Sequence, residues 1–129
     1  MKRQIKNIDD IKLLVDDFYD KVQKDEYLAD IFNNVIQDSW PEHLEKMYQF
    51  WQTILLGEHT YKGTPFAPHV NLPVERKHFN RWLELFKATL EEHFEGEVAE
   101  EAMWRANKMA EMFQMKIDYY KKSSSTFIQ

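Results

Sequence analysis

Residues that break helices are concentrated in one short part of this chain. Its 129 residues include three glycines and four prolines, and three of those prolines fall in GTPFAPHVNLP, residues 63–73. Proteins built from strands need glycine and other turn residues at many tight turns, whereas a few long helices need very few. We therefore expect long continuous helices on both sides of a single irregular stretch, residues 58–73.

The apolar residues repeat with the three- and four-residue spacing of helices that bury one face. The first helix is expected from Ile11, with Asp9 or Asp10 as its cap. A short second helix is expected within residues 26–36, with Val35 on its buried side.

Three more helices are indicated by their ends. DSWP at residues 38–41 is typical of a helix start, and Gly57 of a helix end. Another helix ends near residues 93–96, and the last begins near Glu97. We find no internal repeat and no linker, so residues 1–129 are expected to form one all-α domain, with a core at about residues 10–120 and a frayed tail at 121–129.

The composition excludes several classes of function. The chain has no cysteine, which excludes disulfides, iron–sulfur clusters and thiol catalysis. Its net charge of -5, with no basic face, argues against nucleic acid as a partner. No apolar run approaches the roughly 18 residues of a membrane span, and acidic residues interrupt the N-terminal apolar stretches, unlike in a signal peptide. A cytoplasmic protein without a membrane partner is expected.

One histidine stands inside the irregular stretch. His69 follows Pro68, and Pro73 stops any helix within about one turn. The backbone around His69 is therefore expected to be short and stiff. Such a histidine fits either a plain loop position or a metal ligand held at a fixed angle.

The other histidines carry weaker signals. His59 lies in the irregular stretch without a helical partner, and His93 closes a helix, where a positive charge is favourable. His78 forms a single Glu75-x-x-His78 motif, which carboxylate-bridged di-iron bundles use twice. The second copy is missing from this chain.

Three predicted helices each carry one hydrogen-bond donor on an otherwise apolar face. These donors are Tyr19, His43 and Trp82. Singly, each is also consistent with a core or boundary residue whose polar group is satisfied within the chain. Together, and with a rigidly held histidine opposite them, they match a haem iron with a histidine on one side and a small polar ligand on the other.

An ordered set of motifs in this chain resembles the truncated haemoglobins, most closely their third group. The set reads FYDKV (18–22), IFNN (31–34), W-x-x-HLEKM-x-x-FW (40–51), LLGE (55–58), Y-x-G-x-P (61–65), PHV-x-LP (68–73) and W-x-x-LF (82–86). It extends over roughly residues 10–115 with similar spacing throughout. The paired glycines of the other two groups are missing here.

The resemblance implies a two-over-two helical sandwich around haem b, with the usual proximal helix reduced to a loop and a short helical segment. It implies that His69 is the proximal ligand of the iron, and that the ligand side is lined by Tyr19, His43 and Trp82. The apolar residues that it places against the haem are Phe18, Phe32, Met47, Phe50 and Phe86. Its candidates for contact with the haem propionates are Tyr61, Arg76 and Lys77.

Reversible binding of oxygen and related diatomic ligands is the function that this resemblance implies first. Two or three donors beside such a ligand favour slow release, which suits capture, sensing or redox chemistry better than simple transport. The same scaffold fits a peroxidase-like enzyme or a nitric oxide dioxygenase, which would need an external reductase because the chain has no flavin or nicotinamide domain. A further alternative is a haem-free helical interaction module or a di-iron protein.

Overall fold

The computed structural model describes residues 2–61 and 74–128, with side chains up to residue 119. In chain order the elements are α1 (Ile8–Lys24), α2 (Ala29–Ile36), the 3₁₀ turn η1 (Gln37–Ser39), α3 (Trp40–Leu56), α4 (Arg76–His93) and α5 (Glu97–Ile128). No strand occurs within these residues, apart from an isolated bridge between Arg3 and Phe94. The predicted all-α class is confirmed.

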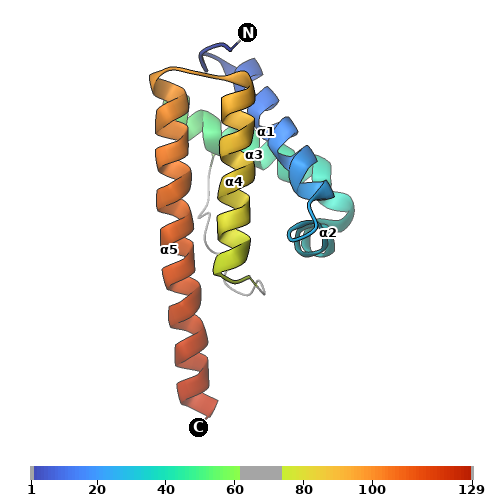
Figure 1. Ribbon diagram of the computed structural model, residues 1–129, viewed down its shortest axis with the longest axis vertical. Coiled ribbons are helices and arrows are strands. Elements are labelled where there is room, and N and C mark those ends of the chain that lie inside the picture. Colours follow the sequence, from blue (N-terminus) through green and yellow to red (C-terminus); the bar gives the residue numbers. More distant parts are fainter. Residues whose placement is uncertain (1, 62–73, 129) are drawn as a thin grey trace.

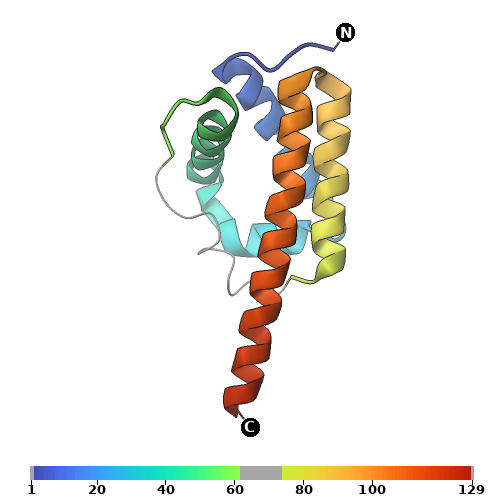
Figure 2. The same cartoon turned by 90° about the vertical axis from the view of Figure 1, so that its left-hand side faces the viewer.

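The helices form two packed pairs (Figures 1 and 2). α4 and α5 run side by side in opposite directions, joined by the short connection at residues 94–96. α1 packs against both α3 and α4, and thereby joins the pair α1–α3 to the pair α4–α5. The short α2 lies against α1. This is the two-over-two arrangement of a truncated globin, as predicted.

Local sequence signals fix the ends of α1 and α3. The Asn7 side chain accepts a hydrogen bond from the Asp10 N–H (3.2 Å), and the Asp10 carboxylate accepts one from the Asn7 N–H (3.3 Å). The prediction that Asp9 or Asp10 caps α1 is wrong, because Asn7 is the cap and Asp10 completes the capping box three residues later. In α3, Pro41 lies in the first turn, and Gly57 ends the helix with a left-handed φ of 71°, as predicted.

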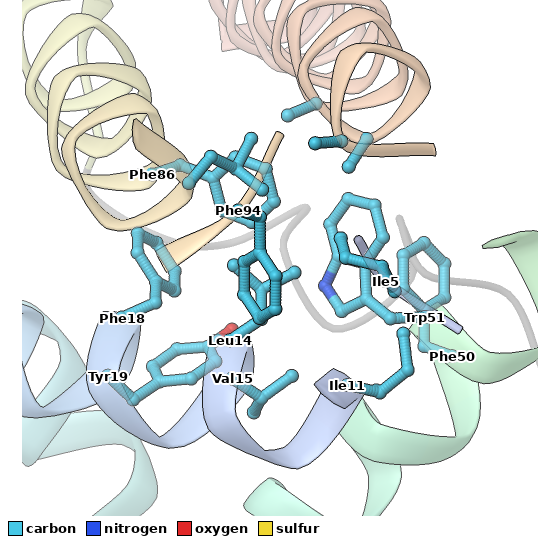
Figure 3. Packing of buried hydrophobic residues seen from close by; sticks show 14 of the residues in the cluster. Ile5, Ile11, Leu14, Val15, Phe18, Tyr19, Phe50, Trp51, Phe86 and Phe94 are labelled. Carbon is cyan, nitrogen blue, oxygen red and sulfur yellow. The ribbon is translucent and has the colours of Figure 1, made fainter. Parts of the chain in front are cut away.

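One face of α1 supplies the centre of the core (Figure 3). Its buried apolar residues are Ile11, Leu14, Val15, Phe18, Tyr19 and Val22. Trp51 from α3, Phe86 from α4 and Ala106 from α5 belong to the same buried cluster. Each large apolar side chain buried in this way contributes about 1.5–3 kcal/mol to folding, so the three-four spacing of α1 decides which way this helix faces.

One local expectation differs from the structure. Val35, expected on a buried side, is 56% exposed, because α2 packs along one side only and buries none of its eight residues. α5 runs as helix to Ile128, and the fraying of residues 121–129 stays a prediction. Among the described residues, no helix has the length and apolar character of a membrane span.

Candidate functional site

Tyr19 lies at the meeting point of three elements. Its side chain projects from α1 and is only 5% exposed. The ring of His43 from α3 lies edge-on to it, with centroids 5.1 Å apart, and the Trp40 ring packs at 5.8 Å. Phe32 from α2 closes another side at 6.2 Å. The structure therefore brings together Tyr19, His43 and Phe32, three of the predicted site residues.

Phe18, the residue before Tyr19, connects this group to α4. Its ring lies edge-on to Trp82 at 5.3 Å and to Phe86 at 5.2 Å. Trp82 and Phe86 are one helical turn apart and stack nearly parallel, at 5.5 Å with an interplanar angle of 4°. The predicted donors of α1 and α4 are thus separated by a single phenylalanine ring.

The second half of α3 continues the chain of aromatic contacts. Trp51 stacks on Phe86 at 5.1 Å, Phe50 contacts Trp51 at 5.3 Å, and Tyr61 contacts Phe50 at 5.3 Å. Met47 is partly buried against the same core. Nine of the twelve predicted site residues therefore lie in or beside one aromatic cluster: Phe18, Tyr19, Phe32, His43, Met47, Phe50, Tyr61, Trp82 and Phe86.

The other three predicted residues lie apart from this cluster or beyond the described part. Arg76 and Lys77 are exposed in the first turn of α4, and the Lys77 ammonium is 3.9 Å from the Glu75 carboxylate. His69, the predicted proximal ligand, lies outside the described residues. Its role therefore stays a prediction.

Some polar atoms of the aromatic cluster have hydrogen-bond partners among the described residues, and others do not. The Trp40 indole N–H donates to the Asn33 side chain (3.2 Å), and the Tyr48 hydroxyl donates to Asp16. The Tyr19 hydroxyl and the Trp82 indole N–H have no hydrogen-bond acceptor among the described residues. Burial raises the pKa of the Tyr19 hydroxyl far above its usual value, so this group stays protonated and can donate.

Two tryptophans of this cluster were not predicted as site residues. Trp40 packs on both Tyr19 and His43, and Trp51 stacks on Phe86. In the sequence, Trp40 stands next to a proline at a helix start, and this position accounts for Trp40 without any contact to Tyr19 or His43. Its distance of three residues from His43, which puts both on one helix side, was the signal that could have found it.

A buried carboxylate fixes α4 beside Trp82. The Asp25 side chain is almost fully buried, and its Oδ1 is 2.6 Å from Nε of Arg81, the residue before Trp82. Its other oxygen accepts hydrogen bonds from the backbone N–H groups of Tyr27 (3.0 Å) and Leu28 (3.2 Å). Asp25 therefore both shapes the turn before α2 and ties that turn to α4.

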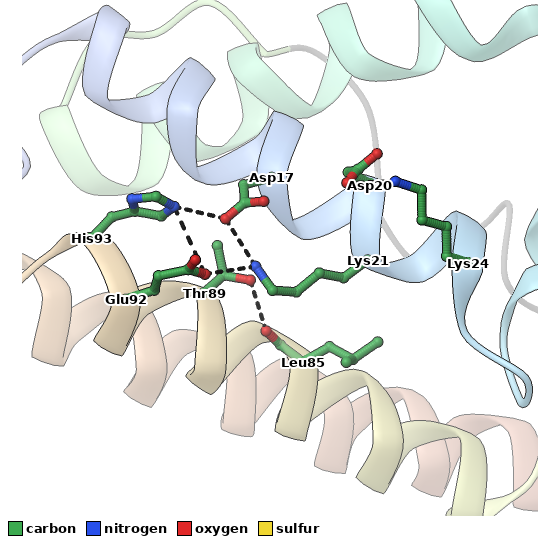
Figure 4. Close-up of polar contacts among 8 residues, drawn as sticks. All are labelled: Asp17, Asp20, Lys21, Lys24, Leu85, Thr89, Glu92 and His93. Carbon is green, nitrogen blue, oxygen red and sulfur yellow. Dashed lines mark hydrogen bonds and ion pairs between the residues drawn. The ribbon is translucent and has the colours of Figure 1, made fainter.

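A second polar group joins α1 to the end of α4 (Figure 4). Nε2 of His93 and Nζ of Lys21 lie 2.7 and 2.8 Å from the same Asp17 oxygen, and Lys21 also reaches Glu92 at 3.0 Å. Burial opposes the ionisation of Asp17, but the hydrogen bonds from Lys21 and His93 outweigh it and lower the pKa of this carboxyl. The ligand atoms of Asp17, Glu92 and His93 lie within 4.8 Å of one another, and the two carboxylates among them already bind the Lys21 ammonium.

The remaining histidines take local roles or none. The Glu75 N–H donates to Nδ1 of His78 (2.8 Å), so the Glu75-x-x-His78 motif forms the start of α4. His59 is exposed. Among the described residues, neither histidine joins the aromatic cluster.

Comparison with known proteins agrees with this geometry. A family model described as "Bacterial-like globin" matches residues 5–117. The group 3 truncated haemoglobin ctb of Campylobacter jejuni is 37% identical over 124 residues, which cover 93% of this chain and 98% of that protein. The crystal structure of a group III truncated haemoglobin from Campylobacter jejuni superposes with a TM-score of 0.83 at 37% identity, and the match covers 91% of this chain and 95% of that one.

The fold, the aromatic cluster and the extent of these matches lead to one assignment. The match covers all five α-helices at least in part and includes every predicted site residue. The chain therefore belongs to the bacterial-like globins, within the third group of truncated haemoglobins, and is a haem-binding globin.

Proposed function

We propose that this protein binds oxygen or a related diatomic ligand reversibly, at a haem b whose iron is held by His69. The observation that carries the proposal is the pair of unused donors on Tyr19 and Trp82. Each comes from a different helix, and the ring of Phe18 touches both side chains. Neither donor atom is among the buried side-chain atoms without a partner, so neither is closed off from solvent, and both are open to a ligand that arrives from outside.

The residues present fit haem b as the resident group. A haem attached through thioether bonds needs cysteine, and the chain contains none. The aromatic cluster offers an apolar surface for a porphyrin, and we assign its contacts to Phe18, Phe32, Met47, Phe50 and Phe86. The positive charges of Arg76 and Lys77, and the Tyr61 hydroxyl, suit the propionates.

When bound, the haem iron supplies the coordination position for a diatomic ligand. Tyr19 and Trp82 would then donate hydrogen bonds towards the polar end of that ligand, and His43 would screen it from solvent. A hydrogen bond to a charged or strongly polarised partner is worth about 1.5–3 kcal/mol, which corresponds to roughly ten- to a hundredfold in dissociation rate. Two such donors favour slow release, and hence capture, sensing or redox use of the ligand.

One observation favours a redox enzyme as the second candidate. His43 lies against Tyr19, and an imidazole ring can accept and donate a proton, as peroxide cleavage requires. A peroxidase-like or nitric oxide dioxygenase activity would need an external reductase to supply electrons. Tyr19 contributes only as a donor in either case, because its raised pKa keeps its proton in place.

Absorption spectroscopy of the purified full chain tests the proposal. We expect a Soret band, a shift on reduction, and distinct spectra under oxygen and under carbon monoxide, with oxygen removed again by lowering its pressure. A chain that takes up no haem when haem is supplied would overturn the proposal. Repeated consumption of nitric oxide or peroxide, with many molecules converted per haem while an electron donor is supplied, would favour the enzyme.

A further inference from the structure

An exposed apolar stripe runs along α5. Four large apolar side chains form it: Trp104 is 56% exposed, Met112 43%, Met115 71% and Tyr119 67%. Only two other large apolar residues of the described chain are exposed to this degree, and they lie far apart in sequence from α5. The stripe is therefore a feature of this one helix.

The stripe lies on the side of α5 opposite the core. At 100° per residue, its four positions fall within one side of the helix, and Lys108 lies between Trp104 and Met112 on the same side. The buried positions of α5 fall on the other side: Ala99, Ala102, Ala106, Ala110, Phe113 and Ile117. Packing against the described core residues therefore leaves the side chains of this stripe largely exposed.

The length of α5 adds to this exposure. α5 has 32 residues, whereas its neighbour α4 has 18, and its C-terminal part continues past the start of α4 (Figures 1 and 2). A row of exposed Met, Trp and Tyr side chains is uncommon on a monomer and typical of the centres of interfaces.

We propose that the stripe binds a second copy of this chain, with the two α5 helices antiparallel. In one register the stripe is complementary to itself: Trp104 of each copy lies opposite Tyr119 of the other, and Lys108 lies opposite Met115. Glu111 and Met112 then flank the twofold axis. Such a symmetric contact closes on itself and stops at a dimer.

Charge favours the antiparallel direction. The first turns of α5 carry Glu97, Glu100 and Glu101, and the sequence becomes basic at residues 121–122. Two antiparallel copies bring opposite charges together at both ends, whereas parallel copies bring like charges together. The same register places Lys108 of each copy within one turn of Glu111 of the other, which it already approaches within its own helix at 3.8 Å.

The size of the stripe sets the expected strength. From Trp104 to Tyr119 the stripe is about 22 Å long, at 1.5 Å per residue, and it is only as wide as one side of a helix. The surface that two such stripes bury against each other falls short of the roughly 1,200–2,000 Å² that stable interfaces bury. The dimer is therefore reversible and dissociates on dilution.

Sedimentation velocity of the full chain over a hundredfold range of concentration tests the dimer. The wild type changes from monomer to dimer as concentration rises, and Trp104→Glu and Met115→Glu each shift that transition at least tenfold upwards. Tyr27→Glu and Val35→Glu are matched controls, since these residues are 50% and 56% exposed elsewhere, and they leave it in place. A wild type that stays monomeric at every concentration overturns the proposal, as does one that binds lipid vesicles through the stripe instead.

Disulfide trapping tests the direction, because the chain has no cysteine of its own. Lys108→Cys and Met115→Cys, mixed and oxidised, form a cross-linked heterodimer, whereas neither variant alone cross-links efficiently. Efficient self-cross-linking of each variant alone indicates parallel helices and overturns the proposed register. No cross-link in any mixture, with both variants folded by circular dichroism, overturns the interface itself.

Discussion

The phenol ring of Tyr19 and the imidazole ring of His43 lie edge to face, with centroids 5.1 Å apart and planes at 86°. The two side chains come from α1 and α3, which pack against each other. Trp40 touches both rings and holds them in place. A change at either residue therefore alters the surroundings of the other, and their effects on a bound ligand are coupled.

Removal of either unused donor should accelerate ligand release. In Tyr19→Phe and in Trp82→Phe, we expect oxygen to dissociate roughly ten- to a hundredfold faster, because each variant loses one hydrogen bond to the ligand. Stopped-flow displacement by carbon monoxide measures the rate. Tyr48→Phe is the matched control, since its hydroxyl already donates to Asp16, and its rate should stay close to wild type. Rates within a factor of two of wild type in both donor variants would mean that neither residue touches the ligand.

His43→Leu should change ligand association more than ligand release. Leucine keeps apolar contact with Tyr19 but removes the polar ring that we propose rotates between ligand and solvent, while the two proposed donors, Tyr19 and Trp82, remain. Flash photolysis of the carbon monoxide complex measures association directly. One result would contradict this role. A low-spin bis-histidine spectrum in the wild-type ferrous protein that disappears in His43→Leu would show that His43 binds the iron.

Asp25→Ala should destabilise the protein without changing the aromatic cluster itself. The substitution leaves Arg81 without its buried partner and removes the acceptor of the Tyr27 and Leu28 N–H groups. We expect the free energy of unfolding to fall by about 2–4 kcal/mol, measured by denaturant titration. Glu84→Ala removes only the exposed partner of Arg81 and should cost far less. Equal losses in the two variants would contradict a special role for the buried carboxylate.

Asp17→Asn should make the free energy of unfolding depend less on pH in the acidic range. Because the pKa of Asp17 is lowered in the folded protein, its ionised form stabilises the fold above the ordinary value of 3.8, and this contribution is lost as the pH falls through the lowered value. We expect a loss of about 1 kcal/mol at pH 7 that disappears in strong acid. Asp20→Asn, which breaks the exposed pair with Lys24, is the control and should cost less. A deficit that persists unchanged at low pH would assign the effect to packing.

Much of this fold follows from local sequence signals. The spacing of Ile11, Leu14 and Phe18 predicts the buried face of α1, because a helix repeats every 3.6 residues whatever its neighbours are. Pro41 and Gly57 predict the ends of α3 from their own backbone preferences. The cap of α1 was harder, because Asn7, Asp9 and Asp10 are all good capping residues and only the geometry selects one.

The contacts between helices could not be predicted from local signals. Asp17 and His93 are 76 residues apart in sequence, and Arg81 and Asp25 are 56 apart. Such pairs depend on how α1 crosses α4, which no periodicity encodes. The truncated-haemoglobin motifs carry such long-range information, and nine of the twelve residues that they point to lie in or beside one aromatic cluster. Trp40 and Trp51 belong to the same cluster but each has an adequate local explanation in the sequence.

The most direct test of the central claim is the absorption spectrum of the full-length His69→Ala variant, with and without added imidazole. If His69 holds the haem iron, the variant loses stable haem, or it retains haem with an altered spectrum that imidazole restores. The matched variant His78→Ala should keep the wild-type spectrum, since the ring of His78 accepts the Glu75 N–H. Normal haem content and an unchanged spectrum in His69→Ala would contradict the assignment, and loss of both in His78→Ala would identify His78 as the ligand.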